Sequence, residues 1–139
     1  MIIDPNTFER FNAVLTGVIV PRPIAFVSTM APDGVVNLAP YSFFNAVSYS
    51  HVVFSSSRHV GNKSKDTLRN IEETGQFVVN IVVDPIADAM NATAAEYPEG
   101  VDEFEIAGLT HAPSQIVKPP RVAESPVNIE CELDQIIQI

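Results

Sequence analysis

The sequence predicts a mainly β fold, an antiparallel barrel or sandwich to which two or three short helices are added. Three observations support this class. Most apolar segments are short and rich in β-branched residues, turn-forming residues separate them, and strands do not alternate regularly with helices as in a doubly wound parallel sheet. A chain of 139 residues has the length of one domain, so residues 1–139 are expected to form a single one.

The first predicted elements are a helix and a β-hairpin. Within residues 4–18 apolar side chains recur at helical spacing, and two prolines directly after this segment end the predicted helix. Residues 24–30 are apolar and β-branched, which predicts a strand, and residues 35–38 form the returning strand. The intervening Ala31-Pro32-Asp33-Gly34 has the residue order of a type I turn.

Four further strands are predicted in the middle and at the end of the chain. Residues 41–47 and 52–57 flank a polar turn. Residues 76–83 are apolar on both faces apart from Asn80, which is typical of a central strand. Residues 127–133 form the last strand, and the five residues at the C-terminus are expected to continue it.

Two helices are predicted in the second half of the chain. Residues 66–74 form the first, with Ser64 or Asp66 as its N-cap and Gly75 as its C-terminal stop. Residues 86–95 suit the second. Two further stretches predict irregular structure, an acidic loop and a proline-rich extended segment: residues 96–105 and 113–126.

The net charge limits the kinds of partner. With 17 acidic and 8 basic residues the formal net charge is −9, which argues against general binding to nucleic acid or anionic membranes. No apolar run approaches the ~20 residues that span a bilayer, and the N-terminus lacks the basic and apolar regions of a signal peptide. Cys131 is the single cysteine, so no internal disulfide can form and a reducing cytoplasm is expected.

The most informative feature is a stretch without acidic residues. Residues 34–65 contain no Asp or Glu, where the average composition of the chain would give roughly four. Half of all the basic residues lie close together at its end: Arg58, Lys63, Lys65 and Arg69. The stretch leads into a predicted helix N-terminus, which favours a phosphate that Lys65 and Thr67 could reach. A solvated polar loop fits the composition equally well. The aromatic residues from Tyr41 to Tyr49 either flank a planar ligand or fill the core.

Other chemical motifs are absent from the sequence. It contains no P-loop motif, no Rossmann dinucleotide motif and no G-x-S-x-G around a serine nucleophile. The three histidines lack metal-site spacing, and no metal site is expected. Glutamates flank Cys131 and would raise its thiol pKa, so we interpret it as a packed residue. No catalytic residue is therefore assigned.

Seven short motifs occur in an order that resembles one known family. They are RPIAFVST (22–29), NLAPYSFFNAVS (37–48), KDTLRNI (65–71), FVVN (77–80), DEF (102–104), GLT (108–110) and ECEL (130–133). Each motif alone is weakly specific, but the ordered set covers most of the chain and resembles the flavin reductase-like, FMN-binding split-barrel flavoproteins. The resemblance implies a Greek-key split barrel that forms a homodimer, with FMN bound near the subunit interface.

The resemblance also implies which residues contact the cofactor. The isoalloxazine and ribityl contacts fall on Arg22, Asn37, Ala39, Pro40, Tyr41 and Ser42, with Phe44 and Asn45 nearby. The phosphate contacts fall on Ser55, Ser56, Lys65 and Thr67. These phosphate residues lie on or directly beside the acid-free stretch, which composition alone had indicated as an anion site.

The activity that the resemblance implies is that of an NAD(P)H-dependent flavin reductase, which transfers a hydride from NADH or NADPH to FMN. The cofactor carries such chemistry, so no catalytic triad is required, and Tyr41 and Phe44 are expected to shape the face on which the nicotinamide stacks. Two alternatives stay open: a non-enzymatic FMN storage or electron-transfer protein, and a shortened structural or dimerisation module without flavin. Family members typically continue past the last residue of this chain, so a short form or a fragment is expected.

Overall fold

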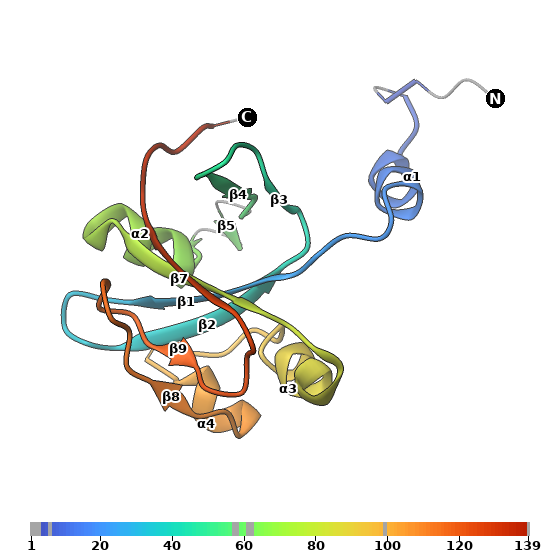
Figure 1. Ribbon diagram of the computed structural model, residues 1–139. Helices are drawn as coiled ribbons and strands as arrows, with labels where there is room; N and C mark the ends of the chain where they lie inside the picture. The colour runs from blue at the N-terminus through green and yellow to red at the C-terminus, as the bar shows by residue number, and fades with distance from the viewer. Residues whose placement is uncertain (1–3, 6, 57–58, 61–62, 99, 139) are drawn as a thin grey trace.

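A four-stranded antiparallel sheet lies at the centre of the computed structural model, which describes residues 4–5, 7–56, 59–60, 63–98 and 100–138. The strand order is β10-β7-β1-β2 (Figure 1). The strands are β1 (Ala25–Met30), β2 (Val36–Tyr41), β7 (Gln76–Ile81) and β10 (Asn128–Glu132). The mainly β class is confirmed, β7 is a central strand as its apolar run predicts, and β2 lies at the edge.

A tight turn joins β1 to β2, as the Pro-Asp-Gly order predicts. The N–H of Gly34 donates to the carbonyl of Ala31 at 2.9 Å, and Gly34 adopts a φ of +94°, which glycine tolerates. Pairing runs in register from Met30 opposite Val36 to the far end of both strands. β2 therefore extends to Tyr41, beyond the predicted segment 35–38, because its later residues also find partners on β1.

Both faces of the sheet are covered (Figure 1). Helix α2 (Asp66–Thr74) packs on one face, and the buried core there consists of Ala25, Val27, Tyr41, Ile71, Phe77 and Val79. The opposite face carries α4 (Glu103–Ala107) and β9 (Arg121–Val122). Its buried core consists of Phe26, Leu38, Phe104 and Val122. The two cores alternate along β1 because successive strand residues point to opposite faces.

The remaining elements are short. Three two-stranded pairs lie around the central sheet: β3 (Phe44–Ala46) with β4 (Val52–Phe54), β5 (His59–Val60) with β6 (Lys63–Ser64), and β8 (His111–Ala112) with β9. The 3-10 turn η1 (Asp84–Ile86) runs into α3 (Ala87–Ala92). The described residues of the predicted strands 41–47 and 52–57 thus contribute only β3, β4 and the last residue of β2, and residue 57 lies outside the described part of the chain.

Asn80 is a buried polar residue in the middle of the apolar strand β7. Its Nδ2 donates to the carbonyl of Phe26 at 2.9 Å, and its Oδ1 accepts from the Val122 N–H at 2.9 Å and from Asn128 Nδ2 at 2.8 Å. The amide is therefore satisfied at both ends, as a buried polar group requires. It ties the proline-rich segment to the sheet.

Helix α1 (Phe11–Val18) stands clear of the sheet (Figure 1). The structure describes all eight of its residues and none of them is buried; Val18 is 70% exposed. The helix begins at Phe11, so it is shorter at its start than the predicted helix 4–18. Arg22 follows the helix, and its Nη1 donates to the carbonyls of Thr16 at 2.6 Å and Ile19 at 2.8 Å, which caps the last turn.

Both helices predicted in the second half of the chain are present, but the predicted N-cap of the first and the predicted end of the second are wrong. The N-cap of α2 is Lys65 rather than Ser64 or Asp66, because the Asp66 carboxylate pairs with Arg69 at 2.9 Å and makes no cap. The predicted second helix 86–95 ends at Ala92. Among the described residues, no helix is long and apolar enough to cross a membrane.

Two predictions about irregular segments and strand ends are also wrong. The predicted acidic loop 96–105 runs into α4, because Asp102 accepts a hydrogen bond from the Phe104 N–H at 2.9 Å and Phe104 is buried against the sheet. β10 ends at Glu132, opposite the first residue of β7, so no partner strand continues beyond it. Residues 133–138 accordingly have no regular secondary structure.

Candidate functional site

The predicted cofactor residues converge where the end of β2 faces the N-terminus of α2. Alternate residues of a strand share one face, so Asn37, Ala39 and Tyr41 lie together on the face that α2 covers. Lys65 and Thr67 come from the first turn of α2, and Thr67 is only 1% exposed. Two segments 30 residues apart thereby meet at one end of the sheet.

Four buried polar side chains join α2 to the β1–β2 hairpin, and we call them the polar clasp: Thr29, Asn37, Thr67 and Asn70. Asn37 Nδ2 donates to Thr67 Oγ1 at 2.8 Å and lies 3.5 Å from Thr29 Oγ1. Asn70 Nδ2 donates to Thr29 Oγ1 at 3.0 Å. These bonds fix the position of α2 on β2, since each buried polar group left without a partner would cost about 1–3 kcal/mol.

Sequence reasoning missed two members of the polar clasp, Thr29 and Asn70. Asn70 lies three residues after Thr67 and one before the buried Ile71, so it falls on the inner face of α2. That spacing was the available signal. Thr29 carries no such signal, because its role depends on which helix packs over β1.

A second group of side chains lies at the start of α2, and we call it the anion group: Tyr41, Ser56, Lys65 and Thr67. The Lys65 Nζ lies 5.6 Å from the centre of the Tyr41 ring. Tyr41 is 6% exposed, and its hydroxyl makes no well-formed hydrogen bond within the part of the chain that the structure describes. Burial raises the pKa of Tyr41, and the nearby hydroxyls of Thr67 and Ser56 act in the opposite direction.

The anion group has the chemistry of a phosphate site. It combines one ammonium with three hydroxyls that can donate hydrogen bonds, and it lies at the N-terminus of a nine-residue helix, whose dipole favours an anion. Asp66 would repel an anion there, but its carboxylate is paired with Arg69 at 2.9 Å. The buried, unpartnered Tyr41 hydroxyl is a group that a ligand oxygen would satisfy. These residues therefore fit the phosphate end of FMN.

The backbone of β2 offers few free donors to a ligand. The Leu38 N–H donates outward from the sheet to Glu103 Oε2 at 2.9 Å. Backbone groups of successive strand residues face opposite sides, so Ala39 and Tyr41 direct theirs toward β1, and Pro40 has no N–H. The first backbone N–H beyond the ladder is that of Ser42. A flavin ring beside this strand would therefore find its first backbone donor there.

The other predicted contact residues are spread around the anion group. Arg22 does not join it, since its guanidinium caps α1 and lies 5.6 Å from the centre of the Phe43 ring. Phe44 is half-buried and packs against the core that contains Tyr41, while Asn45 is exposed. The Ser55 N–H donates to the Phe43 carbonyl at 2.8 Å, which brings Ser55 and Ser56 alongside β3. Arg58 lies outside the described residues.

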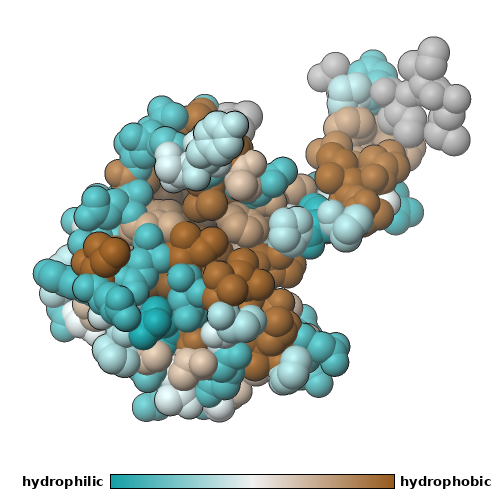
Figure 2. Space-filling model, in the orientation of Figure 1, coloured by the Kyte–Doolittle hydropathy of each residue, from teal (hydrophilic) through white to brown (hydrophobic). Residues whose placement is uncertain are grey.

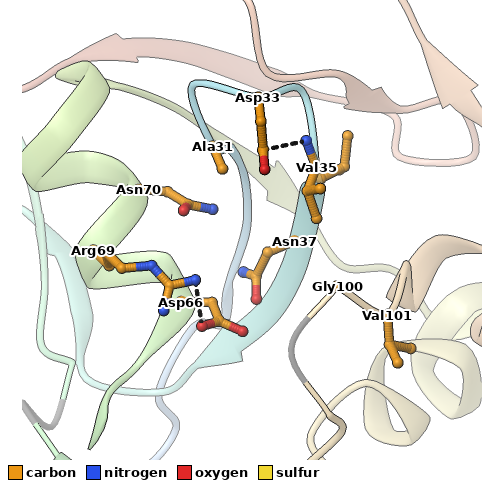
Figure 3. Close-up of a pocket in the computed structure, with 10 residues that line it drawn as sticks. Ala31, Asp33, Val35, Asn37, Asp66, Arg69, Asn70, Gly100 and Val101 are labelled. Carbon is orange, nitrogen blue, oxygen red and sulfur yellow. Dashed lines mark hydrogen bonds and ion pairs between the residues drawn. The ribbon is translucent and has the colours of Figure 1, made fainter.

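A cavity of about 140 Å³ lies beside the polar clasp (Figure 3). Typical ligand pockets are larger, roughly 300–1,000 Å³. Residues from the β1–β2 turn, from α2 and from the segment before α4 line it, among them Asp33, Asn37, Asp66, Asn70 and Val101. It is too small to enclose a flavin, and its charged lining consists of Asp33 and the ion pair between Asp66 and Arg69. The anion group is therefore a candidate phosphate site, and this cavity does not enclose the flavin ring.

Comparisons with known proteins show the family to which the fold belongs. Residues 18–139 match the family described as flavin reductase like domain. An uncharacterised protein of Aquifex aeolicus is 43% identical over 140 residues, covering 99% of this chain and 71% of that protein. The crystal structure of nitrilotriacetate monooxygenase component B from Bacillus cereus is 40% identical with a TM-score of 0.88, covering 97% of this chain and 68% of that one.

The split-barrel architecture is confirmed by a more distant solved structure. A Shewanella frigidimarina protein with a split barrel domain superposes with a TM-score of 0.78 at 23% identity, covering 97% of this chain and 69% of that one. At this identity the likeness shows the fold alone. The mainly β sheet with short helices is thus a split barrel.

Proposed function

Because the chain belongs to the flavin reductase-like domain family, we propose that it binds FMN and acts as an NAD(P)H-dependent flavin reductase. A flavin supplies the redox chemistry of such a protein, and the polypeptide supplies binding and orientation. The single cysteine favours a reducing, cytoplasmic setting. We propose a role for the site residues expected from the resemblance according to where each one lies, at the phosphate end or at the ring end of the flavin.

The observation that carries the proposal is the anion group. Its ammonium and hydroxyls gather at a helix N-terminus, and the buried Tyr41 hydroxyl lies next to the hydroxyls of Thr67 and Ser56 without a well-formed hydrogen bond to either. A phosphate monoester satisfies these donors, and FMN carries such a group whereas riboflavin does not. In the proposed complex Lys65 and Thr67 hold the phosphate, and Tyr41 donates its hydroxyl to the same end of the ligand.

The ring end of the proposed site is open on this chain. Ser42 provides the first backbone N–H beyond β2, and half-buried Phe44 is the candidate to shape the face on which a nicotinamide stacks. Tyr41 is buried and enters the proposal only through its hydroxyl at the phosphate end. An open ring site leaves room for a hydride donor to approach, and it also leaves the ring to be covered by a second subunit.

The exposed apolar residues support the proposed homodimer. None of the side chains of helix α1 is buried against the rest of the described chain, and Figure 2 shows apolar surface on this helix facing solvent. Further exposed apolar residues lie along β3 and β4 and the turn between them: Phe43, Val47, Tyr49 and Val53. Contiguous exposed apolar surface marks an interaction site in soluble proteins. We propose that a second copy of the chain covers these surfaces near the flavin.

The electron acceptor is proposed from the similarity to a monooxygenase component. The Bacillus cereus relative is named as component B of nitrilotriacetate monooxygenase, and this chain spans 68% of its length. We propose that flavin reduced on this chain serves a separate oxygenase. Reduced FMN that leaves the protein and supports a flavin-dependent oxygenase in a coupled assay would fit this role.

The first test is the visible absorption spectrum of the purified protein, before and after addition of FMN and removal of unbound flavin. Flavin bands that stay with the protein support the FMN site. Anaerobic NADH or NADPH then separates a reductase from a carrier, because only a reductase bleaches the bands at a catalytic rate. A folded protein that retains no flavin contradicts the proposal and favours a structural or dimerisation module.

A further inference from the structure

We propose that Asn37 is a positioning residue that acts on the phosphate site through Thr67 and makes no contact with the flavin. The inference rests on the proposed binding of FMN and specifies how the site recognises its phosphate. Asn37 lies on β2, only 8% exposed, and α2 covers the face on which it lies. Its amide is committed to other buried side chains.

The geometry gives the Thr67 hydroxyl a direction. Asn37 Nδ2 can only donate, and it donates to Thr67 Oγ1 at 2.8 Å. The Thr67 oxygen is therefore the acceptor in this bond, and its own hydrogen can only be donated, either to the neighbouring Tyr41 hydroxyl or to a bound anion. Deprotonated phosphate oxygens accept hydrogen bonds and cannot donate them. Asn37 thus presets Thr67 as a donor toward the place where an anion would lie.

The second hydrogen of the Asn37 amide keeps it in this orientation. Asn37 Nδ2 lies 3.5 Å from Thr29 Oγ1, so its two hydrogens face two buried hydroxyls. Thr29 also accepts from Asn70 Nδ2 at 3.0 Å, which anchors it to α2. The polar clasp therefore does more than hold α2 in place, because one of its bonds sets the polarity of a hydroxyl in the anion group.

The consequence is a selective effect on phosphorylated ligands. Loss of the Asn37 bond should weaken FMN, whose phosphate uses the Thr67 hydrogen, and leave riboflavin unaffected. A hydrogen bond to a charged group contributes enough that we expect FMN binding to weaken about tenfold to a hundredfold. If Asn37 touched the ring or the ribityl chain, both ligands would weaken together.

The experiment measures the dissociation constants of FMN and riboflavin by fluorescence quenching for four variants and wild type. The variants are Asn37→Ala, Thr67→Val, the double variant and Asn70→Ala. Thr67→Val is nearly isosteric and removes only the hydroxyl. We expect Asn37→Ala and Thr67→Val to reduce the preference for FMN over riboflavin alike, and the double variant to lose no more than Thr67→Val alone.

Asn70→Ala is the matched control. Asn70 is also a buried amide of the polar clasp, 2% exposed against 8% for Asn37, but it bonds to Thr29 and not to Thr67. We expect this variant to lower the melting temperature while it keeps the preference for FMN. A loss of preference in Asn70→Ala equal to that in Asn37→Ala would overturn the inference, because general loosening of α2 would then explain both.

A measurement on the wild-type protein covers the case in which Asn37 variants fail to fold. The side-chain amide signals of Asn37 in a ¹⁵N-labelled sample are expected to shift on addition of FMN and to stay in place with riboflavin. A shift of the same size with riboflavin overturns the inference. Wild-type protein that binds neither ligand overturns the proposed FMN site itself, and this outcome is distinct from binding of both without phosphate preference.

Discussion

Glu103 in α4 accepts a hydrogen bond from the backbone N–H of Leu38 in the edge strand β2, with 2.9 Å between nitrogen and Oε2. The Glu103 carboxyl is buried, and burial raises its pKa although the Leu38 N–H acts in the opposite direction. The bond satisfies a donor on an open sheet edge. Together with Pro40, which has no N–H, it closes that edge to pairing with another strand.

Two replacements of Glu103 separate the contribution of its hydrogen bond to stability from the contribution of its charge. The pKa of Glu103 in the folded protein is raised above its ordinary value of 4.5, so the folded state favours the protonated carboxyl. Protonated Glu103 therefore stabilises the fold fully below pH 4.5, and this stabilisation is lost as the pH rises through the raised pKa. Glu103→Gln keeps an acceptor without titrating, so we expect it to gain stability relative to wild type as the pH rises toward neutrality. Glu103→Ala leaves the Leu38 N–H without a partner and should lose about 1–3 kcal/mol. Urea unfolding on both sides of pH 4.5 measures these differences.

Tyr41→Phe should change stability and ligand binding in opposite directions. The Tyr41 hydroxyl is buried without a partner among the described residues, so its removal is expected to leave the ligand-free protein as stable as wild type or more so. The same change removes a donor from the anion group and should weaken FMN binding. Thermal unfolding without ligand and FMN titration test the two halves. A large loss of stability without ligand would contradict the assignment.

Local chemistry made the hairpin and helix α2 predictable. The Pro-Asp-Gly order fixes the turn before β2, and the spacing of Leu68 and Ile71 with Gly75 after Thr74 gives both ends of α2 to within a residue. Helix α4 could not be predicted in this way. It has five residues inside an acidic run. It depends on the burial of Phe104 and on the hydrogen bond that Glu103 accepts from a strand 65 residues away.

Local sequence chemistry also made part of the candidate site predictable. Composition located the acid-free stretch, and Lys65 and Thr67 lie at the helix N-terminus to which it leads. The partner of Thr67 was not predictable, because the bond from Asn37 exists only once α2 packs over β2. Asn37 was assigned to the flavin by resemblance, and its buried amide bond gives it a different proposed role.

Lys65→Met should weaken FMN binding without affecting riboflavin. Lys65 provides the ammonium of the anion group, 5.6 Å from the Tyr41 ring centre, and methionine keeps most of the side-chain length. We expect a loss of about tenfold or more for FMN, since hydrogen bonds to charged groups are among the stronger ones. Lys118→Met, in the segment between β8 and β9, is the control and should bind both ligands as wild type does. Equal weakening of FMN and riboflavin by Lys65→Met would place Lys65 elsewhere than at the phosphate.

Val18→Glu should shift the proposed dimer toward monomer. Val18 is an exposed apolar residue at the end of α1, and a charge there would oppose burial against a second copy. Sedimentation velocity over a range of protein concentrations measures the shift. Val35→Glu is the matched control, since Val35 is also an exposed valine but lies beside the β1–β2 turn. Identical sedimentation of all three proteins would exclude α1 from the interface.

Glu130 on β10 binds three successive backbone N–H groups. Its carboxylate accepts from Gln115 at 2.9 Å, from Ile116 at 2.6 Å and from Val117 at 3.2 Å. These bonds, that from Gln115 above all, lower the pKa of Glu130. A lowered folded-state pKa means that the contribution to stability is present above the ordinary value of 4.5 and is lost as the pH falls through the lowered one.

Amide hydrogen exchange at residues 115–117 tests directly whether the Glu130 carboxylate holds this segment. We expect Glu130→Ala to speed exchange of the three amides at neutral pH, because their acceptor is gone. In wild type the relative protection of the same amides should fall as the carboxylate is protonated at acid pH. Glu124→Ala is the matched control: Glu124 accepts from the Thr110 N–H at 3.0 Å, so its loss should expose Thr110 and leave residues 115–117 protected. Protection of residues 115–117 that survives Glu130→Ala would show that the chain is held there by the buried Val117 and not by the carboxylate.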